Sequence, residues 1–492
     1  MSTRNVLDWL EDAARLAPDA VAFDQPGRVL NWNQVRHAAR SIGSFLAAHT
    51  SCQQPVLILM DKSPDCLCAM LGTVYAGCFY TPLDSSMPET RMRLIADTLQ
   101  PALILYEERF ADIAGKLCPN AFCLSDIPVQ ADGFELARRR RQHIDIDLLY
   151  VLFTSGSTGV PKGVSITHSN VIDFVEWACA ALQLPMGLRF GSQAPFYFDN
   201  SVLDIYCAMK MHGSLYLIPR VDFLFPKRLM TRLLEEKIDT LFWVPSALSA
   251  LANADVLRPL PELKRVFFCG EVMPCATLNQ WKAVLPEADY VNMYGPTEIT
   301  DVCAWYRVDR PFADTDSLPV GFACANTRIC LIDGEICVSG ACLSPGYYNA
   351  PDKTAIAFVQ NPLRPQIREM LYKTGDMGAY NDRGELMFLG RRDGQIKRNG
   401  YRIELGEIEA ALCATEGVAL GCCFFHSERN RIVAAYTGST AEKEVRQALK
   451  KALPKYMLPD LILHRDHLPR TGSGKMDRLA LQQEAEYEHL IP

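Results

Sequence analysis

The chain has 492 residues, of which 49% are hydrophobic and 22% are charged. This length exceeds what one hydrophobic core usually organises, so we expect two or more domains. The formal net charge of −7 argues against a nucleic-acid partner, and no apolar run approaches the roughly eighteen residues of a membrane span.

The first six residues lack the basic and apolar stretches of a signal peptide, which predicts a cytoplasmic protein. The eighteen cysteines form no CxxC pair with metal-ligand partners. We therefore expect reduced thiols, mostly small buried side chains, and no cysteine-bound metal. We also expect a monomer.

Apolar periodicity alternates between helix and strand over the first 110 residues. Helices are predicted over 7–16, 33–48 (capped by Asn33), 64–76 and 91–99, and strands over 56–60, 78–83 and 102–106. Alternation of this kind implies parallel sheets covered by helices on both faces. The segment carries no catalytic constellation, so we assign it a scaffold role. The basic run Arg138–Arg141 is predicted to be a solvated linker.

A strand predicted over 148–153 runs into the ten residues TSGSTGVPKG, which cannot pack as core. Glycines let backbone amides approach an anion closely, and hydroxyls and one lysine add donors and charge. The stretch therefore predicts a phosphate-binding loop. Its spacing differs from that of a P-loop, because the lysine follows a proline and precedes a glycine. The candidate contacts are Thr154, Ser155, Gly156, Ser157, Thr158, Gly159 and Lys162.

The segment from Tyr150 to Val164 resembles the phosphate loop of the adenylate-forming superfamily. That group includes acyl-CoA synthetases and the adenylation domains of nonribosomal peptide synthetases. The resemblance implies an enzyme that uses ATP and Mg²⁺ to join a carboxylate to AMP and then passes the acyl group to a thiol. It also implies an α/β fold, with a large N-terminal domain of mixed, mostly parallel sheets between helices and a small, mobile α+β C-terminal domain.

After the loop, a helix is predicted over 170–182, capped by Ser169 or Asn170. Asp199 then stands between Phe198 and an apolar helix, where an unpartnered carboxylate is costly. It could cap the helix that begins near Ser201. The stretch resembles the substrate motif of amino-acid adenylation domains, which implies instead that Asp199 holds the substrate's ammonium group.

Strands predicted over 238–245 and 263–270 end at proline or glycine, where a ligand can sit at the sheet edge, and a strand at 290–294 runs into a Gly-Pro turn. By resemblance, the turn at Gly270 and Glu271 lies beside adenine and Tyr294 stacks on it. Glu298 suits Mg²⁺, and with Thr154 and Lys475 it is a candidate catalytic residue. The remaining nucleotide candidates in this region are Asn292, Gly295 and Thr297.

Asp376 and Arg391 resemble the superfamily's ribose-binding residues, and Asp393 lies where the family bends. We expect domains over 1–392 and 393–492. The second is predicted to contain helices over 405–414 and 442–452 and strands near 418–425 and 431–436. It ends in a glycine-rich segment with Lys475, which resembles the family's closing lysine. The segment 328–334 runs directly into Glu335, so we expect a hairpin that is shorter here than is usual in the family.

The resemblance covers nearly the whole chain and is strongest to free-standing D-alanine–carrier protein ligases of the teichoic-acid pathway. It implies a phosphopantetheinylated carrier protein as a separate partner and D-alanine as the first-choice substrate. Asn200 and Asp301 are polar, which keeps serine or a small basic amino acid open. The predicted pocket wall consists of Asp199, Asn200, Leu203, Trp243, Phe267, Cys269, Met293, Asp301 and Val302.

Two other classes of function compete. An acyl-CoA synthetase would leave Asp199 unexplained, and a non-enzymatic nucleotide-binding module would leave the complete set of site residues unexplained.

The expected adenylation reaction joins two anions, a carboxylate and a phosphate of ATP, so positive charge is required where they meet. The attacking carboxylate is already ionised, and we expect no nucleophilic serine or cysteine.

Overall fold

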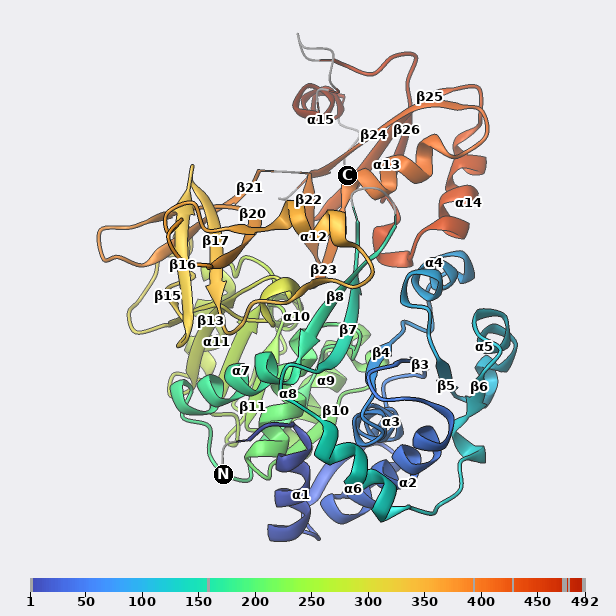
Figure 1. Cartoon of the computed structure of the whole chain (residues 1–492). Helices are drawn as coiled ribbons and strands as arrows, with labels where there is room; N and C mark the ends of the chain where they lie inside the picture. Colours follow the sequence, from blue (N-terminus) through green and yellow to red (C-terminus); the bar gives the residue numbers. More distant parts are fainter. Residues whose placement is uncertain are drawn as a thin grey trace. The chain divides into compact units, whose positions relative to one another are not determined.

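The computed structural model describes residues 3–156, 160–392, 394–426, 429–470, 476 and 478–488. The chain divides into two compact units (Figure 1). Unit 1 comprises Met1–Ser85, Leu99–Leu152 and Gly163–Gly390, and unit 2 comprises Ser86–Thr98, Phe153–Lys162 and Arg391–Pro492. Among the described residues, no helix has both the length and the apolar character needed to cross a bilayer.

Unit 1 contains a nine-stranded sheet, whose strands are β1 (Val21–Gln25), β2 (Arg28–Asn31), β9 (Arg189–Ser192), β10 (Ser214–Leu217), β11 (Thr240–Trp243), β12 (Arg265–Cys269), β13 (Asp289–Tyr294), β14 (Ala304–Arg307) and β15 (Phe322–Ala323). Their order is β15-β14-β13-β12-β11-β9-β10-β1-β2. The inner pairs are parallel, and β2, β14 and β15 pair antiparallel at the two edges.

A seven-stranded sheet is built from β3 (Pro55–Leu59), β4 (Phe79–Pro82), β5 (Leu103–Tyr106), β6 (Ala121–Cys123), β7 (Leu148–Thr154), β8 (Lys162–Thr167) and β18 (Gly346–Tyr347). Their order is β18-β8-β7-β4-β3-β5-β6. The pairs among β3 to β7 are parallel, whereas β18 pairs antiparallel with β8. The prediction of mixed, mostly parallel sheets is therefore confirmed.

Helices cover these sheets: α1 (Leu7–Leu16), α2 (Trp32–His49), α3 (Pro64–Tyr75), α5 (Ala111–Leu117), α6 (Gly133–Gln142), α7 (His168–Ala181), α8 (Asn200–Lys210), α9 (Pro226–Glu235), α10 (Pro245–Asn253), α11 (Cys275–Val284) and α12 (Pro351–Ala357). One continuous core joins both sheets to α1, α2, α3, α7 and α8. A second core packs α9, α10 and α11 on the other face of the nine-stranded sheet.

Two helix starts differ from the sequence prediction. The side chain of Asn31, not Asn33, accepts the amide of Gln34, and the Gln34 side chain accepts the Asn31 amide in return. Thr167 and Asn170 form the same reciprocal arrangement at the start of α7. A capping box satisfies two free amides at once, so it fixes the helix start better than a single cap does.

The remaining sheet of unit 1 contains β16 (Thr327–Ile332), β17 (Glu335–Gly340), β19 (Phe358–Gln360), β20 (Met370–Tyr380) and β21 (Leu386–Arg391). Asp333 and Gly334 connect β16 to β17 with φ values of 51° and 78°. Positive φ at both central residues is the signature of a two-residue hairpin turn. The expected short hairpin is present.

Unit 2 contains α4 (Glu89–Leu99), β22 (Gln395–Arg398), β23 (Tyr401–Glu404), α13 (Leu405–Cys413), β24 (Val418–His426), β25 (Arg431–Gly438), α14 (Glu442–Ala452), β26 (Leu461–His464) and α15 (Arg478–Tyr487). One face of its three-stranded sheet packs on α13 and α14 and the other on α15. Its α+β character is confirmed. The buried residues Arg91 of α4 and Glu407 of α13 form an ion pair.

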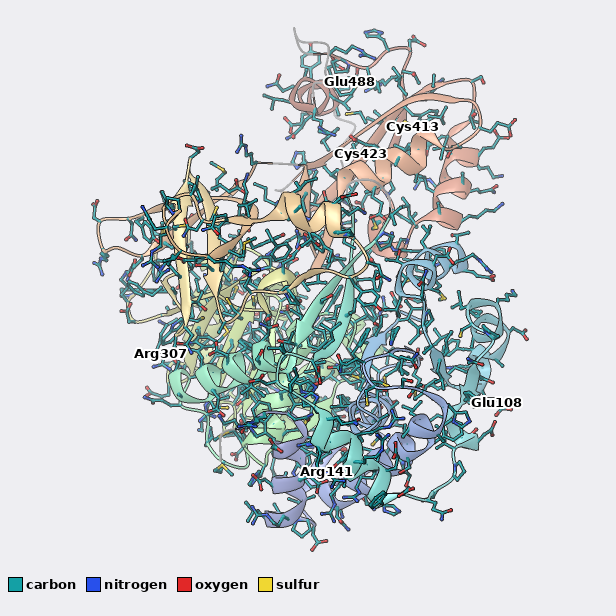
Figure 2. All side chains as sticks on the ribbon, in the orientation of Figure 1. Glu108, Arg141, Arg307, Cys413, Cys423 and Glu488 are labelled. Carbon is teal, nitrogen blue, oxygen red and sulfur yellow. The ribbon has the colours of Figure 1, made fainter. Side chains whose placement is uncertain are left out.

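The basic run at 138–141 is not a solvated linker, and that prediction is wrong. It forms the last turn of α6, where Arg139 is only 5% exposed while Arg141 is exposed (Figure 2). The Arg139 guanidinium donates to the carbonyls of Ala47, Thr50 and Ala76 at 2.6–2.7 Å. These carbonyls close the C-terminal ends of α2 and α3, where positive charge is favourable.

All eighteen cysteines are free thiols. All are buried except Cys52, Cys330 and Cys413, and Cys413 is exposed at the end of α13 (Figure 2). The prediction of mostly buried thiols is therefore confirmed.

Candidate active site

Asp199 stands at the start of α8, but it is not a regular helix cap. Its backbone is already helical (φ −61°, ψ −31°), and its Oδ1 accepts the amide of the adjacent Asn200 at 3.1 Å. A regular cap is extended and accepts an amide two or three residues ahead. The helix start still favours a negative charge here. Capping alone therefore does not account for this aspartate.

Side chains of two neighbouring parallel strands and of α8 provide an apolar wall. Phe267 and Cys269 of β12 and Met293 of β13 share one core with Leu203 of α8. Cys269 pairs in register with Met293. All four side chains are at most 2% exposed. The structure thus brings these four predicted wall residues to one face of the nine-stranded sheet.

Trp243 does not belong to this wall. It lies in register with Phe268, and both belong to the core on the opposite face of the sheet. Its indole donates to the carbonyl of Gly191 at 2.7 Å. Phe242 pairs with Phe267 and lies on the wall's face. The sequence prediction was wrong by one residue, because successive strand residues point to opposite faces.

Asn200 lies beside the turn that follows β12. A Cβ built on Gly270, whose φ is +96°, would be 4.0 Å from Asn200 Nδ2. This nitrogen is buried and has no hydrogen-bond partner among the residues that the structure describes. Asn200 therefore presents an unused polar group next to the predicted adenine-side turn.

The segment after β13 folds back tightly. A Cβ at Gly295 would lie 2.1 Å from the carbonyl oxygen of Asp301, so only glycine fits there. Thr300 and Asp301 have φ values of 59° and 71°, which is uncommon for residues other than glycine. The Thr300 hydroxyl donates to the carbonyl of Cys342 at 2.9 Å. Asp301 and Val302, both 1% exposed, are thereby held against the end of β13.

Asp199 and Asp301 both act on Tyr150, a residue of β7 that the sequence analysis did not assign to the site. Burial raises the pKa of Tyr150, and the charges of these two aspartates add to the effect. The Tyr150 hydroxyl is buried and has no hydrogen-bond partner within the described parts of the chain. The two acids and this hydroxyl therefore share one neighbourhood.

On the nucleotide side, two predicted residues meet directly. The Tyr294 hydroxyl donates to Asp376 Oδ2 at 2.6 Å. Burial raises the pKa of Tyr294, and the negative charge of Asp376 raises it further. The residues come from β13 and β20, in different sheets. The sequence predicted both as nucleotide contacts but gave no sign of this bond between them.

Glu298 belongs to a short 3-10 helix, Thr297–Ile299, and is fully buried. Its Oε1 accepts the hydroxyl of Tyr347 at 2.8 Å, and its carbonyl accepts the amide of Ser344 at 3.0 Å. The carboxylate is therefore fixed in orientation by a tyrosine that the sequence analysis did not assign to the site.

Two further nucleotide candidates make structural bonds. Asn292 Nδ2 donates to the carbonyl of Pro319 at 2.8 Å. Glu271 Oε2 accepts the amide of Ser246 at 2.9 Å. The first bond ties β13, and the second ties the turn after β12, to a neighbouring segment.

The predicted phosphate loop is described in part, within unit 2. Thr154 Oγ1 is buried and has no hydrogen-bond partner among the described residues, whereas Ser155 Oγ donates to the carbonyl of Arg402 at 2.9 Å. A Cβ at Gly156 would lie 2.2 Å from the carbonyl oxygen of Val160, so the loop is packed too tightly for any other residue.

Two predicted nucleotide contacts lie at the ends of strands. Lys162 begins β8, and Arg391 ends β21. Five candidates lie outside the described residues: Ser157, Thr158, Gly159, Asp393 and Lys475.

The fold and this site define the class of protein. Residues 10–348 match the model of the AMP-binding enzyme family, and residues 407–475 match that of the AMP-binding enzyme C-terminal domain. The chain belongs to the AMP-binding enzyme family.

The chain is 31% identical to the D-alanine–D-alanyl carrier protein ligase of Listeria monocytogenes, covering 98% of this chain and 99% of that one. It is 30% identical to the protein of the same name from Bacillus velezensis, with coverage of 97% and 99%. Among solved structures, a nonribosomal peptide synthetase protein with adenylation and PCP domains, bound to a vinylsulfonamide inhibitor, matches with a TM-score of 0.85 and 25% identity. That match covers 98% of this chain and 84% of the other.

Proposed function

We propose that this chain activates D-alanine as an aminoacyl-AMP and transfers it to the phosphopantetheine thiol of a separate carrier protein. The relatives named D-alanine–D-alanyl carrier protein ligase, aligned over nearly their whole length, support the substrate and the acceptor. The observation that carries the amino-acid class is Asp199, a carboxylate at a helix start beside an apolar wall.

A substrate ammonium group suits this position. At about 4 Å and an effective dielectric near 20, a cation–anion pair contributes on the order of 4 kcal/mol. A carboxylate substrate without an amine would leave Asp199 without that gain. The bulky aromatic and sulfur-containing side chains of the wall would favour a small substrate side chain, which suits alanine.

ATP is the second substrate. Tyr294 and Asp376 would receive its adenosine part, and the loop at Thr154–Lys162 its phosphates. The attacking carboxylate and the α-phosphate are both anionic, so the backbone amides of the loop, Lys162 and Lys475 reduce their repulsion. No protein nucleophile is needed, because the substrate carboxylate is already ionised.

A magnesium ion fits the residues present. Mg²⁺ usually keeps several waters and binds one or two carboxylates together with substrate phosphates, rather than a full protein cage. Glu298, held by Tyr347, provides one such carboxylate. When bound, the ion would neutralise phosphate charge. The described residues contain no group of three or more acidic, histidine or cysteine ligands, so Glu298 would act with the phosphates.

We further propose domains over 1–392 and 393–492, with a hinge near Asp393, and a second domain that takes two positions. In one position Lys475 closes the site for adenylation, and in the other the thiol enters. Lys475→Ala should then abolish pyrophosphate exchange yet spare thioester formation from preformed adenylate. Equal loss of both half-reactions would contradict this division.

The deciding experiment is ATP–pyrophosphate exchange screened against D- and L-amino acids and against fatty and aryl acids. We expect D-alanine to give the highest rate. Serine and small basic amino acids belong in the screen because Asn200 and Asp301 are polar. Exchange driven only by an acid without an amine would refute the proposal.

We also propose that the protein is a monomer located in the cytoplasm, where ATP is available.

A further inference from the structure

Lys62, which follows β3 shortly before α3, contacts the chain segment that carries Asp199. Its Nζ donates to the carbonyl oxygen of Ser192 at 2.8 Å and to Ser192 Oγ at 3.1 Å. The same ammonium lies 5.7 Å from the centre of the Phe196 ring, a cation–π distance. Ser192 ends β9, and Phe196 lies three residues before Asp199.

Asp204 lies on α8, about one turn after its first residue, and is fully buried. Neither of its carboxylate oxygens has a hydrogen-bond partner within the described parts of the chain. Burial raises the pKa of Asp204, and the positive charge of Lys62 opposes that rise. Burial likewise lowers the pKa of Lys62, opposed by the charge of Asp204. The two groups therefore lie within each other's field.

These contacts share one geometric consequence. One lysine outside the segment 192–204 acts on its beginning, its middle and its helical end, and Asp199 lies between the last two points. The Asp199 carboxylate accepts the amide of its neighbour Asn200, the first residue of α8. The position of its carboxylate thus depends on how the loop and α8 are held.

We propose that Lys62, together with Asp204, is a positioning residue that sets the amine-binding geometry of Asp199 without touching the substrate. This inference rests on the proposed function, because it assigns Asp199 the substrate amine. Removing Lys62 would release Ser192 and Phe196 and leave a buried carboxylate without its cation, so the loop and α8 would shift. Within the described parts of the chain, the hydrogen bonds and the ring contact of Lys62 involve Ser192 and Phe196 and none of the residues on the nucleotide side, which should stay in place.

The test compares Lys62→Met with Lys210→Met in the full chain. Lys210 is a matched control: it also pairs with an acid, Glu176, and lies 5.9 Å from an aromatic ring, that of Trp9, but it stands at the far end of α8. In pyrophosphate exchange, Lys62→Met should raise the KM for the amino acid about tenfold to a hundredfold, the range expected when a binding group moves by about 1 Å. The KM for ATP should stay within about twofold, and Lys210→Met should change neither.

Asp204→Asn provides a second variant in case Lys62→Met folds poorly, since the amide keeps the shape and removes the charge. It should raise the same KM by a smaller factor. The double variant, Lys62→Met with Asp204→Asn, should be less impaired than the two single effects combined. In this variant no buried Asp204 carboxylate is left without the charge of Lys62.

Hydrogen–deuterium exchange gives a readout that does not depend on activity. Amides over 193–204 should exchange faster in Lys62→Met than in Lys210→Met, with the rest of unit 1 unchanged. An unchanged amino-acid KM, equal rises in both KM values, or faster exchange throughout unit 1 would overturn the inference. If the wild-type enzyme activates no amino acid, the proposed function fails. Unchanged hydrogen–deuterium exchange over 193–204 in Lys62→Met would separately overturn the proposal that Lys62 holds this segment in place.

Discussion

The two sides of the candidate site differ in how their polar groups are satisfied. On the nucleotide side, Tyr294 bonds to Asp376 and Tyr347 bonds to Glu298. On the amino-acid side, Asn200 Nδ2 and the Tyr150 hydroxyl are buried without a partner among the described residues. A buried unsatisfied group costs about 1–3 kcal/mol. We infer that Asp376 and Glu298 on the nucleotide side are oriented before ligand binds, although Thr154 Oγ1 of the phosphate loop has no partner among the described residues. The amino-acid side is completed by its substrate.

The largest effect on one side of the site alone is expected when the charge at Asp199 is removed. Asp199→Asn should reduce amino-acid-driven pyrophosphate exchange about a thousandfold, because it removes the proposed ion pair with the substrate ammonium, which would contribute about 4 kcal/mol. ATP affinity, measured by calorimetry, should be unchanged. Asp65→Asn, which alters an acid in the first turn of α3, is the control. An equal loss of ATP affinity would show that the two sides are not separate.

On the nucleotide side, Tyr347→Phe leaves Glu298 without its orienting hydroxyl. The Mg²⁺ concentration needed for half-maximal exchange should rise about tenfold to a hundredfold, as is typical when the partner of a metal ligand is lost. Tyr348→Phe is a matched control, since its ring packs on Phe79 instead. An unchanged Mg²⁺ requirement would separate Glu298 from the metal.

Tyr294→Phe tests the other bond on the same side. Hydrogen bonds to charged groups contribute about 1.5–3 kcal/mol, so the KM for ATP should rise about tenfold. The KM for the amino acid should stay constant. Tyr306→Phe removes a similar bond to Asp309, also 2.6 Å long, and should leave both KM values unchanged. A rise in the amino-acid KM alone would reverse the assignment of the two sides.

The smallest expected effect is at Asn200. Asn200→Leu removes the unsatisfied amide, so a D-alanine enzyme should lose no more than about threefold in kcat/KM, which is less than 1 kcal/mol. Preference for D-alanine over serine, measured as a ratio of kcat/KM values, should increase. A large loss with D-alanine would mean that the amide is already used with that substrate.

The sequence by itself determined the local elements and the class of chemistry. The helices at Leu7–Leu16 and Glu442–Ala452 have the predicted bounds, because an apolar repeat of 3.6 residues is a local signal. The glycine-rich loop predicted phosphate binding, since its backbone amides and hydroxyls can donate to an anion. The family was predicted by the resemblance of this loop and of the strand ends to the adenylate-forming superfamily.

Only the tertiary structure decided which side chains meet. Both faces of β11 are buried, so no alternation of polar and apolar residues could show that Phe242, not Trp243, faces the site. Tyr294 and Asp376 are 82 residues apart in the chain. Arg139 was misread because a buried arginine has the same sequence pattern as a solvated one, and only the carbonyls around it distinguish the two.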